Sequence, residues 1–155
     1  MKKVILNTDL CAKCRGRCCQ SLPGCAMPED FKPNVKETVL AALVSGQFAI
    51  NWFEGDPRDG RDELDRAYFV RPATTRWRRV FDPSWGGVCV FWRPSGCLLE
   101  PTDRPAGCRL MMPQPDQNCP CEITKRVAAI AWLDYNLTKI GHQAEHELRT
   151  DRWAP

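Results

Sequence analysis

The sequence predicts a small, metal-stabilised single domain over residues 1–155, mainly α-helical, with irregular loops and one short β-hairpin. Three observations lead to this prediction. Ten cysteines and thirteen prolines occur in 155 residues, so thiols are unusually many and loops are frequent. The hydrophobic fraction of 43% includes those cysteines, which leaves a thin supply of core residues. Two segments show helical periodicity, whereas the apolar runs that suggest strands are short.

The first predicted helix begins after Asn34, which is its expected N-cap. Glu37 follows three residues later, as in a capping box. Apolar residues then recur at near-helical spacing over residues 35–48, and Gly46 is expected to end the helix.

The clearest predicted helix lies in the C-terminal part of the chain. Apolar residues keep to one face from Ile123 to Leu148 at steps of three and four residues. Pro120 and Glu122 suit the N-terminus of such a helix, and Gly141 is a place where it could kink.

The intervening region predicts a loop and two strands. Residues 54–66 are nearly all charged, Gly or Pro, which is typical of an exposed loop. Residues 68–70 and 88–92 are candidate strands, and we expect them to pair as a small hairpin.

Composition excludes some classes of protein. No apolar run approaches the roughly 18 residues that a membrane helix needs. The first residues lack the apolar stretch of about 7–15 residues found in a signal peptide. We therefore expect a cytoplasmic protein whose thiols stay reduced, so that metal binding explains ten cysteines better than disulfides do.

The net charge indicates little about partners. The formal value of +3 treats every thiol as unligated. One centre of four thiolates on Zn²⁺ or a [4Fe–4S]²⁺ core lowers it to about +1, and two lower it to about −1. The mild basicity of the sequence is therefore weak evidence for an acidic partner, and nucleic acid is not the expected one.

The cysteines occur in two blocks separated by about sixty residues. Cys11 and Cys14 have the spacing of a metal knuckle, with Gly16 providing backbone freedom and Arg15 and other cations favouring thiolate. The neighbours Cys18 and Cys19 fit one tetrahedral ion only with strain, so they suit two sites or different irons of one cluster. The predicted metal ligands are Cys11, Cys14, Cys18, Cys19, Cys89, Cys97, Cys108, Cys119 and Cys121.

These residues resemble the YkgJ-like cysteine-cluster family, a zinc- or iron-chelating domain described as containing an Fe–S cluster. The family's CxxCxxCC motif is similar to Cys11, Cys14, Cys18 and Cys19, with one additional residue before the Cys pair. Its later signature resembles the segments beginning at Cys89 and Cys97, followed by the Arg-Pro-x-x-Cys-Arg segment of residues 104–109. The resemblance covers residues 11–19 and 89–109, and it implies metal binding more than any reaction.

Two arginines and two further cysteines near the second block are also candidate site residues. Arg104 and Arg109 are expected to bind the cofactor, since a guanidinium can donate to carbonyls or face a cluster's negative charge. Cys119 and Cys121 are expected at the N-terminus of the last helix, which favours a negative centre. Cys25 is the weakest candidate ligand.

Cysteine spacing leaves the metal open, because thiolate-only ligand sets suit both iron and zinc. An iron–sulfur cluster, of the 4Fe–4S type, is the favoured cofactor, and zinc is the alternative. The favoured function is electron transfer, redox sensing or an accessory role in maturation, acting with a protein partner. The alternatives are a zinc-stabilised module that binds protein or nucleic acid, and a cluster-dependent modification enzyme whose substrate pocket the sequence does not locate.

Two further motifs favour simpler interpretations. The sequence His142-Gln-Ala-Glu145-His146 fits H-x-x-E-H, but no suitable third ligand follows, so a polar helix end is expected. The run at residues 76–79 is basic around one tryptophan, yet it spans only four residues, so an exposed loop is expected.

Overall fold

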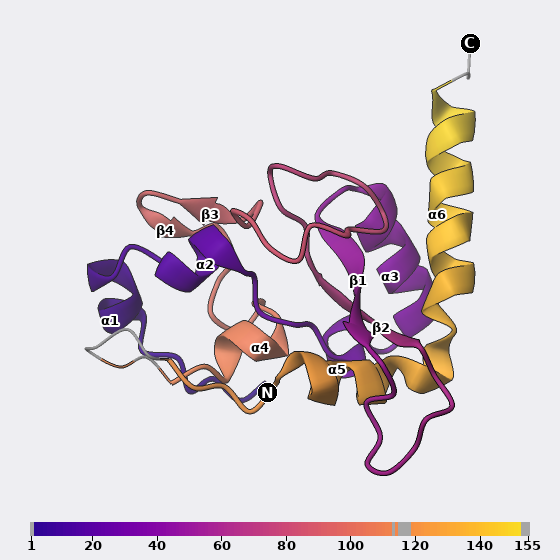
Figure 1. The fold of residues 1–155 in the computed structure, drawn as a ribbon. Helices are drawn as coiled ribbons and strands as arrows, with labels where there is room; N and C mark the ends of the chain where they lie inside the picture. The colour runs from indigo at the N-terminus through magenta and orange to yellow at the C-terminus, as the bar shows by residue number, and fades with distance from the viewer. Residues whose placement is uncertain (1, 113, 115–118, 153–155) are drawn as a thin grey trace.

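The computed structural model describes residues 2–112, 114 and 119–152, and its elements divide between two halves of the molecule (Figure 1). The cysteine half comprises residues 2–25 and 86–124 as far as they are described. Its elements are the helices α1 (Thr8–Lys13), α2 (Arg17–Ser21) and α4 (Ala106–Arg109), and the strands β3 (Trp92–Arg93) and β4 (Gly96–Cys97).

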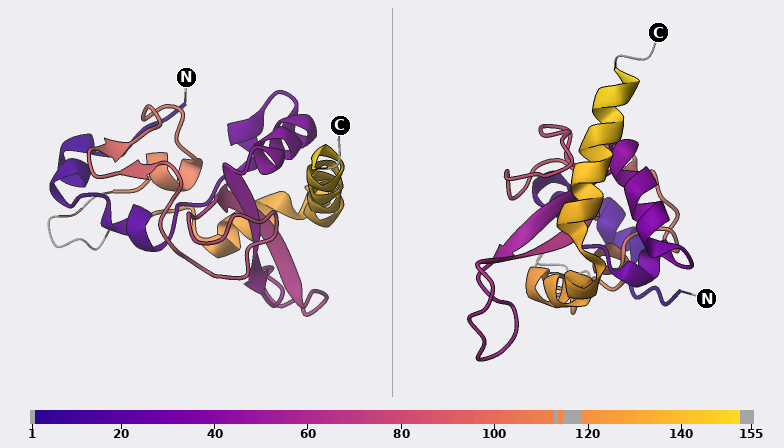
Figure 2. Two further views of the ribbon diagram at one scale, coloured as in Figure 1. Left: turned by 90° about the horizontal axis from the view of Figure 1, so that it is seen from above. Right: turned by 90° about the vertical axis from the view of Figure 1, so that its right-hand side faces the viewer.

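The α/β half comprises residues 26–85 and 125–152. Its elements are the 3₁₀ helix η1 (Pro28–Phe31), α3 (Val35–Val44), β1 (Phe48–Glu54), β2 (Arg66–Pro72), α5 (Lys125–Trp132), the 3₁₀ helix η2 (Leu133–Tyr135) and α6 (Leu137–Asp151). Figure 2 shows α1 and α6 at opposite ends of the molecule.

The prediction of a mainly α-helical fold is wrong. Among the residues that the structure describes, helix accounts for 38% and strand for 16%, with two small antiparallel sheets, so the protein is a small mixed α/β fold. The helix predicted after Asn34 is confirmed, although the Asn34 side chain makes no capping hydrogen bond. That helix ends at Val44, and the aromatic-rich segment from Phe48 continues as strand β1 because it pairs with β2.

The larger sheet is a hairpin of β1 and β2. Its register places Trp52 opposite Tyr68, and residues 55–65 form the connecting loop, which confirms the loop predicted in this region. A parallel segment extends the sheet on the other side of β1, where the Ile50 N–H donates to the Val80 carbonyl at 2.7 Å.

The predicted pairing of residues 68–70 with residues 88–92 is wrong. Residues 68–70 lie in β2, but their partner strand is β1. In the second segment Cys89 forms only an isolated bridge with Thr74, and Trp92 belongs to the small β3–β4 hairpin.

The single C-terminal helix predicted from periodicity is wrong as well. Helix α5 begins only at Lys125, capped by Thr124, whose hydroxyl accepts from the Val127 N–H. Asn136 has a left-handed backbone (φ +48°) and caps α6 by accepting from the Lys139 N–H, so two helices replace one. Gly141 lies within α6 and does not interrupt the helix. It lets the helix approach the Phe81 ring, which a Cβ at this position would meet at 2.4 Å.

The hydrophobic core lies in the α/β half. The Trp132 indole N–H donates to the Ala26 carbonyl at 2.8 Å and anchors α5 at its centre. Other core side chains come from α3, the sheet and α6, namely Val39, Leu43, Ile50, Phe69, Val70, Leu137, Ile140 and Ala144. Of the cysteine half, as far as it is described, only Cys25 belongs to this core. No helix within the described residues is long and apolar enough to cross a membrane.

A buried ion pair crosses the sheet. The Arg71 guanidinium donates to the Asp82 carboxylate at 2.6 Å, and both side chains are fully buried. Arg71 also donates to the Pro72 carbonyl at 3.0 Å, and the other Asp82 oxygen accepts from the Ser84 N–H at 2.8 Å. The pair thereby connects the segment after Val80 to strand β2.

We expect Asp82→Ala to lower the free energy of unfolding by about 3–5 kcal/mol, because it leaves the Arg71 charge buried without a counter-ion. Urea unfolding followed by tryptophan fluorescence measures the change. Asp59→Ala is the control, since Asp59 pairs with Arg126 at the surface and should be nearly neutral on removal. Equal losses in the two variants would contradict this account.

Candidate metal centre

A glycine contact joins the two cysteine blocks. The backbones at Gly24 and Gly107 pass so close that a Cβ on Gly24 would lie 2.7 Å from the Gly107 carbonyl carbon and 2.8 Å from the Cys108 sulfur. The Gly107 N–H donates to the Cys25 carbonyl at 2.8 Å. Only glycine permits this approach, which brings the first block against α4.

Asp30 holds the other side of α4. One of its carboxylate oxygens accepts from the Ala106 and Met27 N–H groups, each at 2.9 Å, and the other pairs with Arg109 at 2.5 Å. Neither Gly24 nor Asp30 was singled out from the sequence. The Pro23-Gly24 dipeptide beside a cysteine was the available signal for the first, and no signal indicated the second.

The second block also runs along the end of α2. The Cys89 N–H donates to the Cys19 carbonyl at 2.7 Å, and the Gly87 N–H donates to the Ser21 carbonyl at 2.7 Å. The Trp92 indole N–H donates to the Arg15 carbonyl at 2.9 Å. These bonds satisfy carbonyls at the helix ends and place residues 87–92 beside Cys18 and Cys19.

Six thiols surround one cavity of about 370 Å³. They come from five segments of the chain: α1, α2, the segment before β3, β4 and α4. The six are Cys11, Cys18, Cys19, Cys89, Cys97 and Cys108. Phe91, Trp92 and Leu99 supply part of the apolar wall of this main thiol cavity.

Backbone amides donate to several of these sulfurs. The Leu99 N–H lies 3.4 Å from the Cys97 sulfur. The Gly24 N–H donates to the Cys108 sulfur, and the Cys89 sulfur accepts from the backbone after it. Such bonds favour the thiolate form that ligates metal, and they are typical of the surroundings of cluster sulfurs. The donor set therefore fits a thiolate-bound metal group.

Burial opposes ionisation of these thiols when no metal is bound. It raises the pKa of Cys89 to about 11, and it also raises the pKa of Cys108. Burial, with added repulsion from Cys18 and Cys14, raises the pKa of Cys11 to about 11, whereas Arg104 acts in the opposite direction.

Cys18 and Cys19 behave as a hydrogen-bonded pair. The Cys19 thiol donates to the Cys18 sulfur, which lowers the pKa of Cys18 and raises that of Cys19.

The remaining cysteines lie elsewhere. Cys14 and Cys119 line a neighbouring cavity of about 510 Å³, which we call the side cavity. Cys18 also lies in its wall. Cys121 donates to the Gly107 carbonyl at 3.3 Å, and Cys25 is buried beside it in the core. Because α5 begins at Lys125, neither Cys119 nor Cys121 lies at a helix N-terminus, contrary to the prediction.

The two predicted cofactor-binding arginines differ in position. Arg104 lines the main thiol cavity and donates to the Leu99 carbonyl at 3.0 Å. Arg109 is buried outside it, where it pairs with Asp30 and donates to the carbonyls of Arg104 and Lys3 at 2.7 and 2.9 Å. Arg109 therefore holds the backbone around the cavity and does not reach into it.

The sulfurs surround a space and do not meet at a point. Within residues 2–112, 114 and 119–152, no three Cys, His, Asp or Glu side chains lie close enough together to ligate a single ion.

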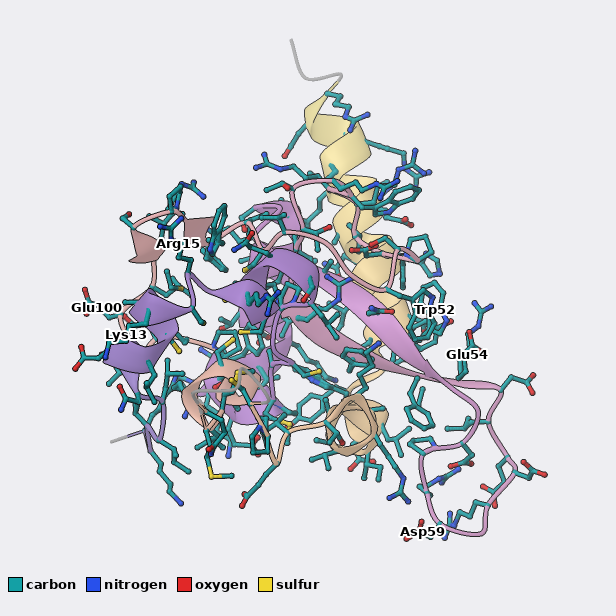
Figure 3. The ribbon with its side chains drawn as sticks, turned by 60° about the vertical axis from the view of Figure 1, so that its left-hand side comes forward. Lys13, Arg15, Trp52, Glu54, Asp59 and Glu100 are labelled. Carbon is teal, nitrogen blue, oxygen red and sulfur yellow. The ribbon has the colours of Figure 1, made fainter. Side chains whose placement is uncertain are left out.

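Lys13 and Arg15 lie on the outside of the cysteine half, far from Trp52 and Asp59 (Figure 3).

The other motifs lie apart from the thiols. His142 is exposed on α6, where its ring contacts Glu145 at 3.2 Å and the Phe81 ring at 5.2 Å between centroids. In the basic run, Arg79 packs over the Trp77 ring at 4.9 Å, and the Trp77 indole N–H donates to the Phe81 carbonyl. Both arrangements are those of polar surface packing.

Comparison with known proteins gives no relative. No protein-family model matches the chain, and neither a curated protein nor a solved structure is detectably similar to it. Inferences about function therefore depend on the thiol geometry and on the resemblance in the cysteine motifs.

We expect Gly24→Ala to separate the two cysteine blocks and to lower metal retention, because the new Cβ would overlap both the Gly107 backbone and the Cys108 sulfur. Elemental analysis of the purified variant measures the loss. Gly46→Ala is the control, since a Cβ there meets no atom within 4 Å and only its left-handed backbone (φ +76°) is strained. Full metal content in Gly24→Ala would show that the glycine contact is dispensable.

Proposed function

We propose that the chain is an iron–sulfur protein that holds a cluster of the 4Fe–4S type in the main thiol cavity. The single observation that carries the proposal is the gathering of six thiols from five segments around one cavity of about 370 Å³. Thiolates gathered this closely and partly buried repel one another and lose hydration, and a bound metal group offsets that cost with its positive charge.

The candidate ligands are all sulfur, which suits both iron and zinc. Two features favour a cluster over a single zinc ion. The thiols surround a space rather than meeting at one point, and a polynuclear core with its own sulfides fills a space. Amide donors to Cys97, Cys89 and Cys108 resemble the hydrogen bonds that adjust cluster potentials.

The proposed role is electron transfer or redox sensing with a protein partner. Cys11, Cys18, Cys19 and Cys97 are only half-buried, so a partner could approach the group they hold. The resemblance to the YkgJ-like cysteine-cluster family supports metal binding by the same residues. Free thiols in this number fit a reducing compartment, and we propose a cytoplasmic location on that ground.

Anaerobic purification tests the cofactor. We expect a brown protein with iron and acid-labile sulfide in equal amounts and with visible absorption that bleaches on reduction. Cys108→Ser should lose most of this absorption, because Cys108 lines the main thiol cavity from α4.

Cys121→Ser is the matched control for that variant. The Cys121 thiol donates to the Gly107 carbonyl and lines neither cavity, and a serine hydroxyl can make the same bond, so the absorption should remain. A colourless protein with stoichiometric zinc would contradict the iron–sulfur proposal and favour a zinc-stabilised module instead.

Removing the metal should unfold the cysteine half and leave the α/β half folded. The hydrophobic core and helices α3, α5 and α6 lie outside the cysteine half, so they do not depend on a metal there. After chelation we expect most of the far-ultraviolet circular dichroism to remain, while proteolysis cuts the segments before Gly24 and around residues 89–104. Complete loss of helical signal would contradict this division.

A further inference from the structure

The main thiol cavity has more sulfurs than one cluster of the proposed type uses. A 4Fe–4S core takes four cysteine ligands, whereas six thiols line this cavity. Three of the six, Cys11, Cys18 and Cys19, belong to the first cysteine block, and one of them, Cys18, lies on the side of the main cavity that it shares with the side cavity. One cluster therefore leaves two of these thiols without a metal.

The side cavity adjoins the main one on that side. Cys14, Cys18 and Cys119 line it, together with Arg17, Gln20, Ser21 and Met111. Cys18 and Met111 contribute to the walls of both cavities, so the two spaces are neighbours. The side cavity has its own thiols from α2, from the end of α1 and from Cys119.

Cys11 and Cys14 belong together on α1. Cys11 lies within the helix and Cys14 is its C-cap, so the two side chains are three residues apart on one face. The Cys14 thiol donates to the Cys11 carbonyl at 3.3 Å, which holds it over that turn. Cys18, Cys14 and Cys119 all act electrostatically on Cys11, in agreement with a group of four.

Cys19 faces the other group. Its carbonyl accepts from the Cys89 N–H at 2.7 Å, and its thiol is influenced by Cys89 and Cys108. Consecutive side chains on a helix differ in direction by about 100°. Cys18 and Cys19 therefore fit two adjoining centres better than one.

We propose that the protein has two adjoining four-cysteine metal centres. Cys19, Cys89, Cys97 and Cys108 surround the main thiol cavity, and Cys14, Cys18 and Cys119 of the side cavity are completed by Cys11, which lines the main cavity and lies three residues before Cys14. Each takes an iron–sulfur cluster, whose own sulfides let its cysteine ligands stand farther apart than the ligands of a single ion. The inference rests on the proposed function, because it concerns how many centres these thiols hold.

The two remaining cysteines agree with this division. Cys25 is only 6% exposed in the hydrophobic core, and Cys121 is bonded to the Gly107 carbonyl. Neither lines either cavity. The ten cysteines thus separate into two groups of four and one pair that needs no metal.

The test measures iron, zinc and acid-labile sulfide per chain in the anaerobically purified full-length protein. We expect about eight iron and eight sulfide ions, as for two cubane clusters. A single centre per chain, with four iron ions and no zinc, would overturn this inference and leave the proposed function intact. A protein without thiol-bound metal would overturn both.

Paired variants assign the centres. Cys14→Ser with Cys119→Ser should lose the side-cavity metal and keep the other centre, and Cys89→Ser with Cys97→Ser should do the reverse. Cys121→Ser should keep both centres and serves as the control. Retention of all metal by the Cys14 and Cys119 double variant would overturn the inference. If either double variant fails to fold, the metal count of the unaltered protein still decides the number of centres.

Discussion

The contact between the backbones of Gly24 and Gly107 is the constraint on which the thiol arrangement depends. The first cysteine block and α4 are separated by more than eighty positions in sequence, and this contact brings them together at a distance that no Cβ could occupy. Asp30 secures the same region by accepting from the Ala106 N–H and pairing with Arg109. The sulfur of Cys108 is thereby held against the first block.

The two halves of the molecule are stabilised by different interactions. In the α/β half, apolar side chains from three helices and a sheet make a continuous core, and a buried Arg71–Asp82 pair fastens the added segment to it. The cysteine half has short helices and a two-residue hairpin, with few buried apolar side chains among the residues described. Its order depends on backbone hydrogen bonds and on whatever its thiols bind.

Electrostatics explain why the thiol group would be coupled to a ligand. Burial raises the pKa of Cys11, Cys89 and Cys108, so these thiols are neutral when nothing is bound. A metal group replaces those protons and supplies the positive charge that makes buried thiolates tolerable. Amides aimed at the sulfurs of Cys97 and Cys108 then favour the ionised form without bringing further charged side chains into the site.

Local patterns in the sequence determined the helix after Asn34, the charged loop between β1 and β2, and the concentration of metal-ligating side chains in two blocks, because each depends on neighbouring residues. Tertiary contacts decided the rest. Phe48 continues a helical period but pairs with Pro72 in a sheet, and Val127 and Ile130 continue an apolar face but are exposed once Asn136 turns the chain. The sequence likewise could not predict how the thiols are grouped. The Cys19 carbonyl and Gly24 contact residues that lie 65 or more positions away in the sequence. Periodicity records which side chains are apolar, whereas only the folded chain determines which surfaces meet.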